Sequence, residues 1–68
     1  MKVYLVNWEQ IMDDYTDYGT IGVYQSEADA RVAINNITTP EFDPLPLVTI
    51  YETQLGSRNL VLIDKIQL

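Results

Sequence analysis

This chain of 68 residues contains neither cysteine nor histidine. A domain of this size buries only about 60% of the surface that its unfolded chain exposes, so its stability is marginal. The absence of cysteine excludes disulfides, and the absence of both residues removes the usual ligand sets of structural zinc. We therefore expect one domain over residues 1–68 that is held together by apolar packing or by association with another chain.

The distribution of β-branched and aromatic residues predicts four strands. Such residues dominate four runs of the sequence, which are 2–8, 20–25, 47–55 and 60–68. The last two runs are separated by Gly56-Ser57, a pair suited to a two-residue hairpin turn. That turn would place Tyr51 opposite Leu62 and Ile50 opposite Ile63.

One helix is predicted between the second and third runs. Ser26 is suited to cap a helix, and the acids that follow it favour the positive end of the helix dipole. Apolar residues at helical spacing then extend the pattern, so we expect a helix over 27–37 that ends before Pro40. The predicted fold class is α+β in the order ββαββ, with one helix on a mostly antiparallel four-stranded sheet.

Residues 9–19 allow two interpretations. Ile11, Met12, Tyr15 and Tyr18 fit one face of a short helix, but the same stretch could form a long acidic hairpin loop. Like charges four residues apart on a helix repel each other, which weighs against the helical alternative.

Both faces of the predicted sheet carry apolar residues, which one short helix cannot cover. In the C-terminal hairpin one face is expected to hold Leu47, Tyr51, Leu60, Leu62 and Ile66, and the other Val48, Ile50, Val61 and Ile63. The uncovered face would be closed by the segments 9–19 and 38–46 with Phe42, by a second copy of the chain, or by a different protein. The second of these would make the protein a homodimer through its second sheet face.

The charge of the chain is negative and unevenly distributed. Ten acids and four bases give a net charge of −6, and residues 9–43 hold eight of the acids with a single base, Arg31. This balance disfavours direct binding of nucleic acid, which requires many lysines and arginines. Without histidine, neither Ser26 nor Ser57 has an imidazole base, so we expect no enzymatic activity and no cofactor or metal.

The acidic half of the chain also carries aromatic residues, and together these suggest a surface for a basic protein. Carboxylates can imitate the sign and spacing of nucleic-acid phosphates, and aromatic side chains often dominate interface energies. The expected partner-binding residues are the acids Glu9, Asp13, Asp14 and Asp17 and the aromatic anchors Trp8, Tyr15 and Tyr18.

Several short motifs resemble a family of small uncharacterised bacterial and phage domains. These motifs are Met1-Lys2-Val3-Tyr4, Ile21-Gly22-Val23-Tyr24 with Ser26-Glu27, then Ala30 and Ala33-Ile34, and Phe42 before Pro44. The similarity covers residues 1–52. It implies a cytoplasmic α+β module and no assigned activity.

The sequence thus predicts a non-enzymatic, acidic protein-binding module. A more specific hypothesis is an inhibitor of the kind that phages direct against host defence, similar in action to anti-CRISPR proteins, which would occupy the basic nucleic-acid channel of its target. The alternatives are an immunity protein that neutralises a basic toxin and a homodimeric structural domain. No apolar run approaches the ~20 residues that span a bilayer, and the start of the chain lacks the pattern of a signal peptide, so we expect no membrane partner and a cytoplasmic location.

Overall fold

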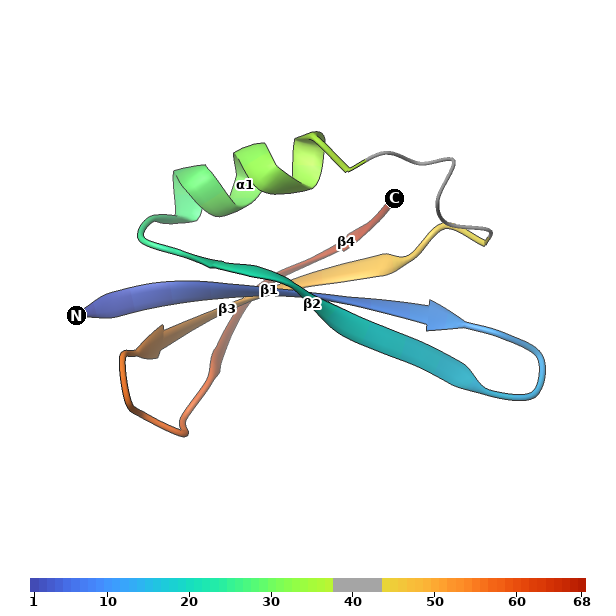
Figure 1. Cartoon of the computed structure of the whole chain (residues 1–68), viewed down its shortest axis with the longest axis horizontal. Helices are drawn as coiled ribbons and strands as arrows, with labels where there is room; N and C mark the ends of the chain where they lie inside the picture. The colour runs from blue at the N-terminus through green and yellow to red at the C-terminus, as the bar shows by residue number, and fades with distance from the viewer. Residues whose placement is uncertain (38–43) are drawn as a thin grey trace.

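The computed structural model, which describes residues 1–37 and 44–68, is a four-stranded antiparallel sheet with one helix (Figure 1). Its elements are β1 (Lys2–Ile11), β2 (Thr16–Tyr24), α1 (Glu27–Asn35), β3 (Leu47–Gln54) and β4 (Val61–Gln67). The strand order in the sheet is β2-β1-β3-β4. The predicted α+β class and the ββαββ order are confirmed.

The helix begins where its capping residue predicts. The backbone N–H of Asp29 donates to Oγ of Ser26 at 3.1 Å, and Glu27 and Asp29 lie in the first turn. The helix ends at Asn35, two residues before the predicted end. The backbone N–H of Asn36 contacts the carbonyl oxygens of both Val32 and Ala33, which tightens the last turn.

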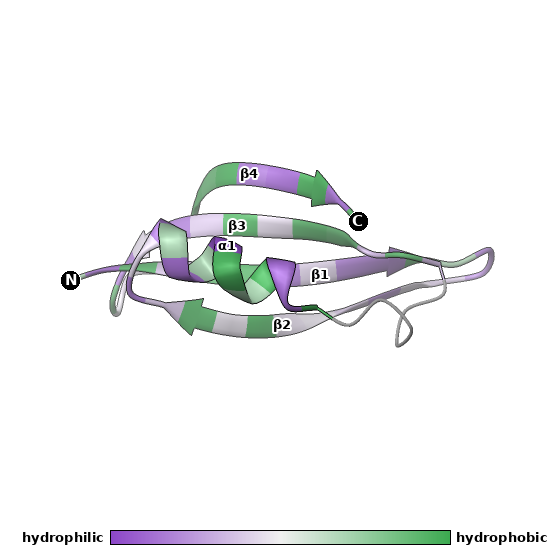
Figure 2. Cartoon of the chain, turned by 90° about the horizontal axis from the view of Figure 1, so that it is seen from above, coloured by the Kyte–Doolittle hydropathy of each residue, from purple (hydrophilic) through white to green (hydrophobic). Residues whose placement is uncertain are grey.

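The core lies between α1 and one face of the sheet. Val6 and Ile50 face each other across β1 and β3 and are both 0% exposed. Val48, Ala30 and Ile34 complete the buried cluster. Seen from above, α1 lies over the middle of the sheet and β4 lies to one side of it (Figure 2). Within residues 1–37 and 44–68 no helix covers the opposite face of the sheet, and we call it the open face.

The pairing of the strands shifts register on both sides of Val6 and Ile50, which we call the central pair. On one side Val6 pairs with Gly22 and Asn7 with Thr20, so Ile21 of β2 is an extra residue. On the other side Ile50 pairs with Asp64 and Tyr51 with Leu62, so Ile63 of β4 is an extra residue. Ile21 and Ile63 both pack against the core. Each bulge therefore adds one isoleucine to the apolar layer beneath the helix.

The first bulge also determines which residues of β2 face the helix. Beyond it, Gly19 pairs with Trp8 and Tyr18 with Glu9. A Cβ atom at Gly19 would lie 2.7 Å from Nε1 of Trp8, so the indole ring rests against the glycine. Gly19 thus provides the space in which Trp8 packs on the core.

Three details of the predicted strand pairing are wrong. The turn at the end of β3 has Leu55 and Gly56 at its centre, with Gly56 at φ 84°, and residues 55–60 form a longer connection than a two-residue Gly56-Ser57 turn. The pair Tyr51–Leu62 is confirmed, but Ile50 faces Asp64 instead of Ile63 because of the bulge. For the same reason Ile66 pairs with Val48 on the helix side and does not share a face with Tyr51.

Residues 9–19 form neither a helix nor a long loop. The strands β1 and β2 continue through most of this segment, and the connection is closed by a bond from the N–H of Met12 to the carbonyl oxygen of Tyr15 at 2.8 Å. The segment therefore does not fold over the open face. The proposed covering role of Phe42 falls outside the described residues.

We expect Ile50→Val to lower the free energy of unfolding by about 0.5–1.5 kcal/mol, because it removes one methyl group from the fully buried central pair. Val32→Ala is the matched control, since Val32 is on the exposed side of α1 and its truncation should change stability by no more than about 0.5 kcal/mol. Urea unfolding followed by circular dichroism measures both. Equal effects of the two substitutions would contradict this placement of the core.

Candidate functional site

The far half of the β1–β2 hairpin extends past the end of the helix (Figure 1). We call residues 9–18 the arm. The arm contains four acids, Glu9, Asp13, Asp14 and Asp17, and no base, so it carries a charge of −4. Its large side chains Ile11, Tyr15 and Tyr18 are exposed, and Tyr18 is 78% exposed. The arm is therefore acidic and exposes apolar surface as well.

The predicted binding residues are close in sequence, but the structure divides them among three places. Asp13, Asp14 and Tyr15 lie at the tip of the arm, between the ends of β1 and β2. Glu9 and Tyr18 are cross-strand partners on the open face. Trp8 precedes Glu9 and Asp17 precedes Tyr18 in the strands, so both point to the opposite face. This is the helix side, where Trp8 packs against the core.

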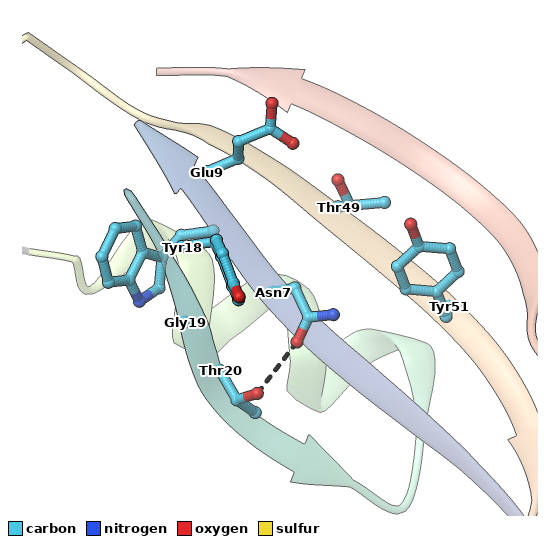
Figure 3. A pocket seen from close by; sticks show the side chains of 8 residues that line it. Asn7, Glu9, Tyr18, Gly19, Thr20, Thr49 and Tyr51 are labelled. Atoms are coloured by element: carbon cyan, nitrogen blue, oxygen red, sulfur yellow. Dashed lines mark hydrogen bonds between the residues drawn. The ribbon is translucent and has the colours of Figure 1, made fainter. Parts of the chain in front are cut away.

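Three of the predicted residues, Trp8, Glu9 and Tyr18, line a shallow hollow of about 460 Å³, and most of the other residues around it lie on the open face. Figure 3 shows their side chains with those of Asn7, Thr20, Thr49 and Tyr51 around this hollow. The residues come from β1, β2 and β3, and Asn7 lies between the two tyrosines. Oγ1 of Thr20 donates to Oδ1 of Asn7 at 3.1 Å, which fixes the Asn7 amide.

Sequence reasoning missed four of these residues, which are Asn7, Thr20, Thr49 and Tyr51. Asn7 and Glu9 are two residues apart on β1, and Thr49 and Tyr51 are two residues apart on β3. The members of each pair therefore point to the same face of their strand, and the sequence shows this. The position of Thr20 and Tyr18 depends on the bulge at Ile21. Gly19 and Gly22 inside β2 are the sequence signal for that irregularity.

The salt bridges between described residues all lie outside the arm. Nζ of Lys2 is 3.1 Å from Oε1 of Glu52, and Arg31 bridges Glu27 at 3.0 Å and Asp64 at 3.2 Å. The hydrogen bond to Glu52 raises the pKa of Lys2, and those to Glu27 and Asp64 raise the pKa of Arg31. Among the described residues, no base forms an ion pair with an acid of the arm.

Within residues 1–37 and 44–68, no three acidic, histidine or cysteine side chains gather in a way that would hold a metal ion. In the same ranges, no helix has both the length and the apolar character needed to cross a bilayer.

Comparison with known proteins gives no relative. No family model, no curated protein and no solved structure matches this chain.

We expect the uncompensated acids of the arm to make stability depend on salt. Raising NaCl from low concentration to 0.5 M screens their mutual repulsion, because the Debye length falls to about 4 Å. Added salt should therefore raise the free energy of unfolding of the natural chain more than that of the variant Asp13→Asn/Asp14→Asn/Asp17→Asn, which removes three of the four charges. Urea unfolding at the two salt concentrations measures this difference.

A charge-matched control changes the helix and leaves the arm intact. Asp29→Asn/Val32→Lys/Asn35→Lys also adds three positive charge units, at exposed positions of α1. It should keep the salt dependence of the natural chain. If both variants lose this dependence equally, the effect comes from net charge and not from the arm.

Proposed function

We propose that this protein is a non-enzymatic binding module whose arm docks on a basic surface of a partner protein. The observation that carries the proposal is the composition of the arm, which has a charge of −4 and exposed Ile11, Tyr15 and Tyr18. Acids speed association with a basic surface and confer sensitivity to salt, and the desolvation of aromatic side chains supplies affinity.

The position of the arm supports this proposal. Because the arm extends past the helix and outside the buried cluster, it can enter a groove of a partner without rearranging the fold. The principal extents of the molecule are 37 × 24 × 15 Å, so the partner would meet a thin and elongated wedge.

The more specific proposal is an inhibitor that fills the nucleic-acid channel of a basic defence protein. In such a channel Glu9, Asp13, Asp14 and Asp17 would take the places of phosphates, while Tyr15 and Tyr18 would contact the surfaces that receive bases or sugars. The same surface would serve an immunity protein whose partner is a basic toxin. The identity of a captured partner separates these two proposals.

We expect one basic protein to be retained from a lysate of the native host by the immobilised natural chain at low salt and released at 0.5 M NaCl. The variant Asp13→Asn/Asp14→Asn/Asp17→Asn should lose at least about tenfold in affinity for that protein, since each close charge pair across an interface contributes on the order of 1.5 kcal/mol or more. Isothermal titration calorimetry with the purified partner measures the change.

The helix variant Asp29→Asn/Val32→Lys/Asn35→Lys controls for net charge in this experiment and should bind like the natural chain. If both triple variants bind the partner with the affinity of the natural chain, the arm is not the docking surface and the proposal is wrong.

A second candidate function is self-association through β4. This strand is at the edge of the sheet, and Leu60 just before it and Val61 and Leu62 at its start are exposed. Leu55, in the turn before it, is 68% exposed. An edge strand with apolar residues on both faces is a template for pairing with another chain. This candidate places the contact at the sheet edge and not on the second sheet face.

If β4 pairs two copies, light scattering should give twice the chain mass of 7.8 kDa, and Val61→Lys should restore the monomer. Ile63→Lys is unsuitable for this test, since Ile63 packs against the core and the substitution would unfold the domain. Lys65→Glu, on the same strand but outside the apolar stretch, is the control. A monomeric natural chain at all concentrations would exclude this candidate.

A further inference from the structure

The hollow on the open face has a chemical character that goes beyond the general acidity of the arm. It combines one carboxylate, Glu9, with three aromatic residues, Trp8, Tyr18 and Tyr51, and with neutral polar groups (Figure 3). Thr49 is only 7% exposed, so the hollow has an ordered base on β3. The two tyrosine rings come from strands on either side of β1.

The groups around the hollow fit a flat cation. The Glu9 carboxylate forms no ion pair with any residue that the structure describes, so it remains able to accept hydrogen bonds from a ligand. Tyrosine rings attract cations over their faces. A guanidinium group stacks on such rings, and it donates two parallel hydrogen bonds to a carboxylate.

Other classes of ligand fit the hollow less well. An anion would meet Glu9 and the remaining negative charge of the arm. A wholly apolar side chain would desolvate Asn7, Thr20 and Thr49 without satisfying them. An ammonium group is compact and more strongly hydrated than a guanidinium, so it gains less from two tyrosine rings. A base on the same face, Lys65, lies opposite Thr49 on β4, two strands from Glu9.

We infer that this hollow binds an arginine side chain of the partner protein, with the guanidinium paired to Glu9 and stacked on Tyr18. The inference rests on the proposed function for its biological partner. The hydrogen bond from Thr20 occupies Oδ1 of Asn7, while the Asn7 amide nitrogen donates to no described residue. That nitrogen can bind a backbone carbonyl oxygen of the segment that carries the arginine. Asn7 would then orient the segment on the open face.

The test uses the whole chain labelled with ¹⁵N and a small probe, N-acetyl-arginine methylamide, in an NMR titration. Shifts that saturate should appear at the Asn7 side-chain amide and at the backbone amides of Tyr18, Thr49 and Tyr51. The neutral isostere N-acetyl-citrulline methylamide should give no saturable shift, and the lysine analogue should bind more weakly than the arginine probe.

Two variants and one control separate the hollow from the general charge of the arm. Glu9→Gln should weaken arginine binding by about fivefold, the upper range for an exposed charge pair. Tyr18→Leu should weaken it by about the same factor, the upper range for an exposed contact between a cation and an aromatic ring. Asp17→Asn removes the same charge from the opposite face of the arm and should change binding by less than twofold. The same spectra show whether each variant is folded.

Three results would overturn the inference: equal binding of the citrulline probe, shifts confined to Asp13 and Asp14, or equal effects of Glu9→Gln and Asp17→Asn. If one of these results is found while binding of the captured partner still requires the acids of the arm, the inference about the hollow is wrong and the proposed function is not affected. If the arginine probe binds in the hollow but no captured protein requires the arm for binding, the site is supported and the proposed function is contradicted.

Discussion

The contact between Val6 and Ile50 is the interaction on which the rest of the structure depends. These residues face each other on the two central strands, are fully buried, and contact the layer formed by Ala30 and Ile34 of the helix. Nine residues of helix cannot cover four strands, so the buried cluster is small. The sheet has a bulge on each side of this pair, and each bulge directs an extra isoleucine into the same apolar layer. The two isoleucines enlarge the small core.

The bulge at Ile21 links the core to the candidate site. Regular pairing beyond Val6 and Gly22 would set Thr20 opposite Trp8 and Gly19 opposite Glu9. The bulge instead sets Gly19 beneath Trp8 and places Tyr18 beside Glu9. One added residue thus allows the indole ring to pack on the helix side and brings a tyrosine to the hollow on the other side. The packing of the core and the composition of the open face have a common origin.

Local signals in the sequence were sufficient to predict the elements and their order. The β-branched runs and the cap at Ser26 depend on neighbouring residues, and they correspond to β1, β2, β3, β4 and α1. The strand extensions through residues 9–11 and 16–19 could not be predicted in this way. Their acids have low β propensity, and pairing between β1 and β2 overrides that preference.

The candidate site was only partly predictable for a related reason. Glu9 and Tyr18 were selected for charge and aromaticity, but their proximity to Thr49 and Tyr51 depends on the register of three strands. The bulge at Ile21 changes the register of β1 and β2 by one residue, and the packing of Ile21 against the core favours it. Trp8 was selected by the same criteria, yet alternation along β1 places it on the helix side.

The separation between the arm and the buried cluster has an evolutionary consequence. Residues 12–15 contribute nothing to the core, so substitutions there are not constrained by the packing that holds the domain together. Selection can therefore alter the tip of the hairpin over many generations while the helix and the central strands remain the same. A lineage that faces a changing counterpart would gain from this arrangement, because new recognition surfaces can arise without the loss of a marginally stable scaffold.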